Sequence, residues 1–127
     1  MNKPQIVLVR SVKELINKNQ IGYGWKGVNF SIYSTDNELI EQGFKQQGYH
    51  LGRKTKQIKR YFNLKENDIV VVPVSGAITF AIVEGTKSYV VNPSEEYSNN
   101  RIKVKYLSSR GLGSDPKQGI KLSQREF

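Results

Sequence analysis

The sequence predicts an α+β domain in which five to six strands form a small, partly open β-barrel flanked by two to three helices. Ile69–Val74 and Ala77–Val83 are almost unbroken apolar runs joined by Ser75-Gly76. Strands this apolar are buried on both faces, so we place them at the centre of the sheet. A basic amphipathic segment and the polar turn Lys65–Asp68 precede them, which indicates a helix packed beside the barrel.

The N-terminal segment predicts a strand and a short helix. Ile6–Val9 is apolar and follows Pro4, which favours an edge strand because proline lacks a ladder donor. Ser11 and Glu14 stand three residues apart, a spacing typical of a capping box. We therefore expect a short helix over Val12–Asn17.

Glycines mark the second predicted strand, Ile21–Trp25. Gly22 and Gly24 alternate with larger residues, which indicates a backbone that approaches another part of the molecule closely. The following residues, Asn29–Tyr33, extend this strand or form a loop.

Two helices are predicted between this strand and the central pair. Asp36 is the expected N-cap of a helix that runs to about Gln47 and ends at Gly48. The second helix runs from about Arg53 to Phe62, because its apolar residues recur at i, i+3 and i+4 and its other faces are Lys and Arg.

The C-terminal part predicts two further strands. Tyr89–Val91 is short, and Asn92–Asn100 is a polar loop. Ile102–Leu107 alternates, which directs Lys103 and Lys105 outward. Residues 1–107 are expected to form one domain. Residues 108–127 form a basic, glycine-rich tail with one short strand near Ile120–Leu122, which could be a truncated link to a further domain.

Composition narrows the classes of function. The chain has no cysteine, which excludes disulfides, thiolate chemistry and cysteine-based zinc sites. No apolar run approaches the roughly 20 residues that cross a bilayer, and the N-terminus lacks a signal-peptide pattern. We expect a cytoplasmic protein without a membrane partner. The net charge of +9, from 20 basic and 11 acidic residues, favours polyanionic partners.

The positive charge is clustered in two places. No acidic residue lies between Glu41 and Glu66, whereas the second predicted helix carries several basic residues. These basic residues can follow a phosphate backbone or form a solvated face of the helix. They are Arg53, Lys54, Lys56, Lys59 and Arg60. The second set, equally consistent with phosphate binding or with plain solvation, is Arg101, Lys103, Lys105 and Arg110.

An aromatic and glycine-rich segment predicts a place for a ligand. Trp25, the only tryptophan, lies among glycines and offers a stacking platform for a base. Tyr23 and Tyr89 are expected to join it. Asn29 and Ser31 are expected to read the edge of that base. The alternative is that Trp25 only anchors the core.

Catalysis is not expected in this chain. His50 is the only histidine and stands apart from any carboxylate cluster, so we predict no catalytic residues, no metal and no cofactor. Asp68, Glu84 and Lys87 approach the pattern of a restriction-type nuclease, but the lysine is one position too far. Asp68 is better interpreted as the residue of a turn before a strand.

Several segments, in order, resemble a known family. They are QIGYGW from Gln20, IKRYFNLKENDIVVVP from Ile58 and AITFAIVEGTKSYVV from Ala77. Together they resemble the N-terminal domain of Mrr-type restriction endonucleases. That domain looks like a member of the PUA-like superfamily, to which the EVE modules also belong. The chain departs from that pattern at Asn67, where a glycine is usual, and at Tyr23, which is inserted before Trp25.

The resemblance implies a PUA-like pseudo-barrel that binds nucleic acid, with one base turned into an aromatic cage. It also implies a separate C-terminal nuclease domain. We therefore expect a DNA-binding module that targets a restriction or defence endonuclease and reads a flipped or modified base. The alternatives are an RNA-binding domain of the same fold, or a basic protein-interaction domain without base readout.

Overall fold

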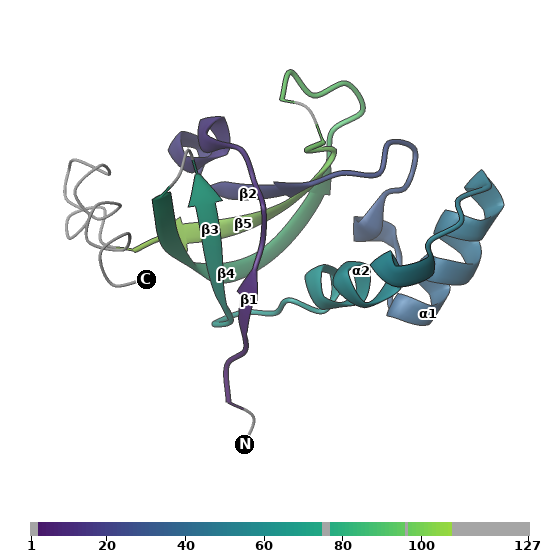
Figure 1. Ribbon diagram of the computed structural model, residues 1–127, viewed down its shortest axis with the longest axis horizontal. Helices are drawn as coiled ribbons and strands as arrows, with labels where there is room; N and C mark the ends of the chain where they lie inside the picture. Colours follow the sequence, from purple (N-terminus) through teal and green to yellow (C-terminus); the bar gives the residue numbers. More distant parts are fainter. Residues whose placement is uncertain (1–2, 75–76, 96, 108–127) are drawn as a thin grey trace.

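The computed structural model describes residues 3–74, 77–95 and 97–107. Within these residues, five strands form one mixed sheet in the order β1-β3-β4-β5-β2, which curls into a half-barrel with two helices beside it (Figure 1). The strands are β1 (Ile6–Leu8), β2 (Gln20–Tyr23), β3 (Ile69–Val74), β4 (Ala77–Tyr89) and β5 (Asn100–Tyr106). The predicted α+β class and the partly open barrel are confirmed.

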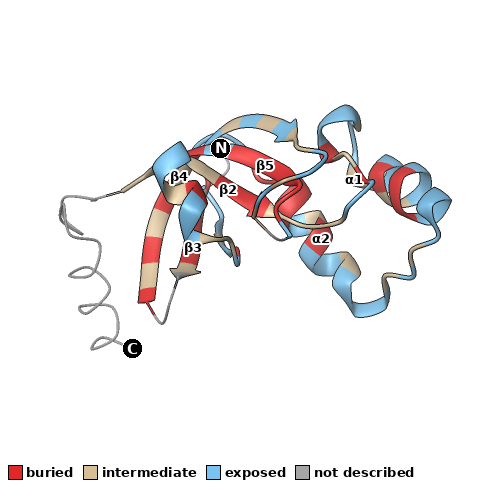
Figure 2. Cartoon of the chain, turned by 90° about the horizontal axis from the view of Figure 1, so that it is seen from above, coloured by how far each residue is buried: buried red, intermediate tan, exposed pale blue. Residues whose placement is uncertain are grey.

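The central strands follow the sequence pattern. β3 begins and ends at the predicted residues and pairs antiparallel with β4. Buried and half-buried residues alternate over the first half of β4, and Ala81 and Val83 lie in the core with Val70 and Val72. The inner sides of these strands are buried, as the red segments of Figure 2 show.

β4 joins two predicted strands into one. It continues to Tyr89 after an irregularity between Val83 and Lys87. Gly85 lies there with a φ of +104°, a backbone conformation that glycine adopts without steric cost. The prediction of a separate strand over Tyr89–Val91 was therefore wrong, because the bulge lets the ladder with β5 continue.

The two edges of the sheet leave the half-barrel open. Among the described residues, β1 pairs only with β3, in parallel, and β2 pairs only with β5. The edge position of β1 agrees with Pro4. The capping box at Ser11 was wrong: the Ser11 hydroxyl instead accepts a hydrogen bond from the Gly22 backbone N–H at 3.0 Å. The short helix that follows is a 3₁₀ helix over Lys13–Lys18.

The first helical segment begins one residue earlier than predicted. Thr35, rather than Asp36, is the N-cap, and Thr35 with Glu38 forms a capping box. α1 (Asp36–Glu38) continues as a π-helix over Leu39–Phe44. A 3₁₀ turn then ends at Gly48, as predicted, with a φ of +83°. Asn29–Tyr33 does not extend β2, because Phe30–Ile32 forms a 3₁₀ turn.

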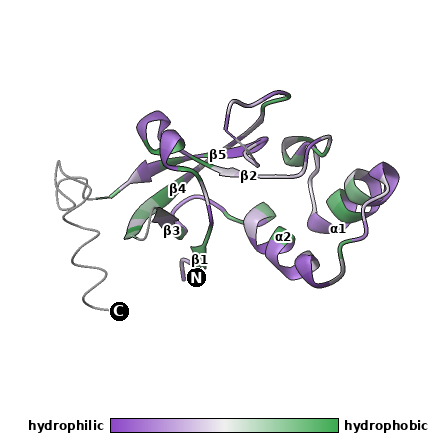
Figure 3. Cartoon of the chain, turned by 45° about the horizontal axis from the view of Figure 1, so that its top comes forward, coloured by the Kyte–Doolittle hydropathy of each residue, from purple (hydrophilic) through white to green (hydrophobic). Residues whose placement is uncertain are grey.

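α2 (Thr55–Phe62) follows a 3₁₀ turn over Gly52–Lys54. Its predicted apolar face is confirmed: Ile58, Tyr61 and Phe62 are buried. Most of the remaining surface of α2 is hydrophilic, shown in purple in Figure 3. The helix is held to the sheet at its C-terminal end, where the Lys87 ammonium donates to the Phe62 carbonyl at 2.6 Å.

β5 alternates as predicted. Ile102 and Val104 are buried, and Lys103 and Lys105 are exposed. The half-buried Tyr106 donates its hydroxyl to the Gln20 carbonyl at 2.8 Å. β5 begins two residues earlier than predicted. The tail over residues 108–127, Arg110 and the strand near Ile120–Leu122 lie outside the described residues.

Candidate functional site

A tight turn after β2 presents the only tryptophan. The Val28 backbone N–H donates to the Trp25 carbonyl at 3.1 Å. Within the turn, Trp25 has a φ of +74° and Gly27 a φ of +87°. A bulky residue rarely adopts this left-handed conformation, and such strain persists only where the surroundings hold it. The conformation of the turn therefore depends on contacts with other parts of the protein.

Three side chains supply that support. Asn100 is 1% exposed, and its amide nitrogen donates to the Gly24 and Val28 carbonyls at 2.7 and 2.9 Å. The Tyr49 hydroxyl donates to the Lys26 carbonyl at 2.8 Å, and the Tyr89 hydroxyl accepts from the Gly27 N–H at 2.7 Å. These bonds come from three separate parts of the chain, so they fix the turn before any ligand arrives.

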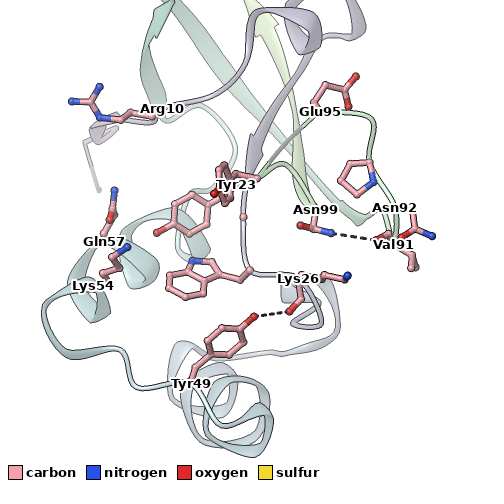
Figure 4. Close-up of a pocket in the computed structure, with 14 residues that line it drawn as sticks. Arg10, Tyr23, Lys26, Tyr49, Lys54, Gln57, Val91, Asn92, Glu95 and Asn99 are labelled. Atoms are coloured by element: carbon pink, nitrogen blue, oxygen red, sulfur yellow. Dashed lines mark hydrogen bonds between the residues drawn. The ribbon is translucent and has the colours of Figure 1, made fainter.

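A pocket of about 700 Å³ lies beside this turn (Figure 4). Its aromatic lining consists of Tyr23, Trp25, Tyr49 and Tyr97. Lys54 and Gln57 lie on one side of it and Asn99 on the other. The pocket therefore brings together the end of β2, the start of α2 and the loop between β4 and β5.

The aromatic rings are held in fixed orientations. Trp25 packs edge-to-face on Phe44 and Tyr49, with centroid distances of 5.1 and 5.2 Å. Tyr23 stacks on the buried Tyr61 at 4.6 Å. Burial raises the pKa of the Tyr23 hydroxyl, and the neighbouring Trp25 offsets part of that rise. Trp25 is half-buried, so it both anchors the packing around it and lines the pocket.

The rim of the pocket is basic. Arg10, Lys26 and Lys54 line it and are exposed, and the Lys54 ammonium lies 5.6 Å from the centroid of the Trp25 ring. Among the described residues, Glu95 is the one acidic residue of the lining, and it is paired with Arg101 at 2.8 Å and with Lys18 at 3.5 Å. An anion entering the pocket therefore meets cations whose charge Glu95 does little to offset.

A second hollow of about 550 Å³ adjoins the first. The two share Arg10, Tyr23 and Gln57. The second extends between β1 and α2, where Arg60 and Tyr61 line it. We call the two hollows together the cleft; it runs from the open side of the half-barrel to the turn at Trp25.

Four of the predicted residues line the cleft. Tyr23, Trp25 and Lys54 line the first hollow, and Arg60 lines the second. Lys54, Gln57 and Arg60 recur every three residues, so they share one side of the helical segment. Lys56 and Lys59 stand two residues after Lys54 and Gln57, and neither of them lines a hollow.

The structure does not bring the other predicted phosphate ligands to the cleft. Arg53, Lys56 and Lys59 line neither hollow. Lys103 and Lys105 stand on the outer side of β5, and the Lys103 ammonium lies 3.6 Å from Glu84. The buried Arg101 donates to Glu95, Gln20 and the Ser98 carbonyl. The charge of Arg101 is therefore paired with Glu95 inside the protein.

The residues predicted to read a base edge are also elsewhere. The Asn29 side-chain oxygen accepts from the backbone N–H of Ser31 at 2.9 Å and from the Ser31 hydroxyl. This interaction caps the 3₁₀ turn over Phe30–Ile32. Tyr89 does not line the pocket and supports Gly27 from outside it. Asn29, Ser31 and Tyr89 therefore have structural partners that their sequence positions did not reveal.

Several residues that line the cleft were not predicted from the sequence. Arg10 follows the edge strand, Tyr49 follows Gly48, and Gln57 lies between the basic residues of α2. Tyr97 and Asn99 come from the polar loop, where a φ of +56° at Tyr97 marks a tight turn. The run Ser98-Asn99-Asn100, just before an alternating strand, was the available signal, because asparagines at strand ends often bond to nearby backbone.

Asp68 has a structural role. Asp68 is fully buried and accepts from the Gln5 and Lys65 backbone N–H groups at 3.0 and 2.9 Å. It is the predicted turn residue, and it also ties the chain before β1 to β3. Within residues 3–74, 77–95 and 97–107, no three His, Asp or Glu side chains come together in a way that could hold a metal ion.

Comparison with known proteins gives no match to a family model, to a curated protein or to a solved structure. In the described part of the chain, no helix combines the length and the apolar character that a membrane crossing requires.

Proposed function

We propose that this chain is a nucleic-acid-binding module that holds one unstacked base in the pocket beside Trp25. The observation that carries the proposal is the cleft itself. It combines a half-buried tryptophan, flanking tyrosines and a basic rim in one continuous groove. Stacking on an aromatic ring stabilises any base, and cations along the groove bind the phosphates on either side.

The fixed turn at Trp25 supports this proposal. Unstacking a base costs a few kcal/mol, which stacking and hydrogen bonds in the pocket must recover. A platform already held by Asn100, Tyr49 and Tyr89 loses little entropy when a base arrives. A methyl group on the base would add apolar contact, which allows a modified base to be preferred.

DNA is the polymer we favour, because the resemblance to Mrr-type restriction endonucleases implies it. In that role the module would target a restriction or defence endonuclease whose nuclease is a separate domain. RNA is the second candidate, since the cleft suits any unpaired strand with a basic path beside it. A basic protein-interaction domain without base readout is the third.

The test is binding of duplex DNA, single-stranded DNA and RNA by the wild type and by Trp25→Gly. Glycine adopts the left-handed backbone at this position, so it removes the ring while the turn is kept; circular dichroism and a thermal melt check the fold. Duplexes with and without cytosine or adenine methylation test the modified base.

We expect the variant to lose roughly 5- to 150-fold in affinity, the range of one lost stacking contact of about 1–3 kcal/mol. Equal, steeply salt-dependent binding to every polymer by both proteins would leave only a basic surface and would contradict the base pocket. Stronger binding to unpaired RNA than to every DNA would make RNA the natural polymer.

A further inference from the structure

Asn99 is held in one orientation on the wall of the pocket. It is 6% exposed, and its amide nitrogen donates to the carbonyls of Val90 and Val91 at 3.1 and 3.4 Å. Rotating the amide by 180° would place its oxygen against these two carbonyls, so the rotated form is unfavourable. The assignment of nitrogen and oxygen therefore follows from the two backbone partners.

The amide oxygen of Asn99 points into the pocket. Figure 4 shows this oxygen on the side that faces Tyr23, while the nitrogen points to Val91. In residues 3–74, 77–95 and 97–107 no side chain or backbone N–H donates to it. Because the bonds of the nitrogen fix the orientation of the amide, this oxygen offers one fixed acceptor to whatever occupies the pocket.

The other polar groups that line the pocket do not offer a fixed acceptor. Gln57 and Asn92 are exposed amides, and among the described residues no hydrogen bond holds either side chain in place. The Tyr49 hydroxyl already donates to the Lys26 carbonyl, and Glu95 is occupied by Arg101 and Lys18. The cations at the rim are donors only. A ligand that reaches the wall of the pocket therefore meets the Asn99 oxygen as a preset acceptor. It satisfies this oxygen only with a hydrogen-bond donor, which on a base is an N–H group.

We propose that Asn99 selects adenine or cytosine through the amino group at C6 of the purine or C4 of the pyrimidine; this rests on the proposed function. Adenine has an N6 amino group and cytosine an N4 amino group, where guanine and thymine carry carbonyl oxygens. An amino group donates to the Asn99 oxygen. A carbonyl in its place would bring two acceptors together and leave both without a donor.

The experiment changes one group on the ligand and one on the protein. The probes are short single strands of abasic residues with one central base, so that only that base can enter the pocket. Adenine is compared with purine, which has hydrogen in place of the amino group, and cytosine with 2-pyrimidinone. The proteins are the wild type, Asn99→Ala, Trp25→Gly and the control Asn92→Ala, an exposed amide of the same pocket.

We expect the wild type and Asn92→Ala to prefer adenine to purine, and cytosine to 2-pyrimidinone, by roughly three- to tenfold, the size of one neutral hydrogen bond. Asn99→Ala should bind both members of each pair equally. Because the preference is a ratio within one protein, a moderate loss of stability in Asn99→Ala does not affect it.

Two results would overturn the inference and leave the base pocket in place: equal binding of adenine and purine by the wild type while Trp25→Gly weakens both, or an unchanged preference in Asn99→Ala. Binding of every probe that does not respond to Trp25→Gly would overturn the proposed function as well.

Discussion

The cleft and the outer side of β5 are both basic, and each contains residues that the sequence offered as candidates for phosphate binding, but they are built differently. On β5, Lys103 and Lys105 alternate with buried residues, and Lys103 lies near Glu84. In the cleft, Arg10 follows β1 while Lys54 and Arg60 lie on the helical segment that contains α2, and all three line hollows that also contain aromatic rings. The difference shows that a count of charges in the sequence does not reveal which of them converge on an aromatic surface.

The largest effect we expect in this comparison is a loss of stability when Asn100, which holds the turn at Trp25, is replaced. Asn100→Ala would remove the partners of the Gly24 and Val28 carbonyls and of the Phe30 N–H. Unpaired buried groups cost about 1–3 kcal/mol each, so we expect a loss of about 3 kcal/mol in the free energy of unfolding, measured by urea denaturation. Lys105→Ala is the control on β5 and should change it by less than about 0.5 kcal/mol. Equal losses in the two variants would contradict the special role of the turn.

A smaller loss in the free energy of unfolding is expected when Gly22 is replaced, because β2 packs there against the loop before β5. An added Cβ would lie 2.6 Å from Leu15 Cδ1 and 2.7 Å from Ser98 Cβ, closer than atoms can approach. Gly22→Ala should cost about 2 kcal/mol, the middle of the range for overpacked sites. Gly24→Ala is a matched control, because its Cβ would meet Tyr97 at 3.6 Å, an ordinary contact. Thermal melts of the two variants check the difference, and a stable Gly22→Ala would show that β2 can shift.

The electrostatic part of the comparison is tested with pairs of charge-removing variants. Lys54→Gln with Arg60→Gln should weaken binding of single-stranded DNA and lower the slope of log K against log salt by about 1.4, at about 0.7 for each lost phosphate contact. Lys103→Gln with Lys105→Gln removes the same charge from β5 and should leave the slope nearly unchanged. Equal reductions in both pairs would mean that β5 takes part in the path of the strand.

The smallest expected effect is a pH dependence of stability at the rim. Burial raises the pKa of Glu95, but its backbone hydrogen bond, Lys18 and Arg101 together bring the pKa below the ordinary 4.5. The folded state therefore favours the ionised form. Its contribution is present above pH 4.5 and is lost as the pH falls below that value. Unfolding of wild type and Glu95→Gln should differ at neutral pH and converge in acid. A difference that persists in acid would assign the effect to the shape of the side chain.

The sequence alone determined the parts of the fold that depend on local periodicity. The apolar run of β3, the buried face of α2 and the alternation of β5 were all predicted, because burial of one face repeats with the period of a helix or a strand. Tyr23, Trp25, Lys54 and Arg60 were also assigned to a site before their surroundings were known. Their residue types suit stacking and phosphate binding wherever they lie.

Only the tertiary structure decided which side chains meet in the cleft. Asn100 bonds to Val28, 72 residues away, and this contact fixes the turn at Trp25. Asn29 and Asn99 are the same residue type, yet one caps a turn and the other faces the pocket. Their partners are distant in the sequence or depend on the exact path of a loop. Periodicity carries no information about such contacts, so they follow only from the folded chain.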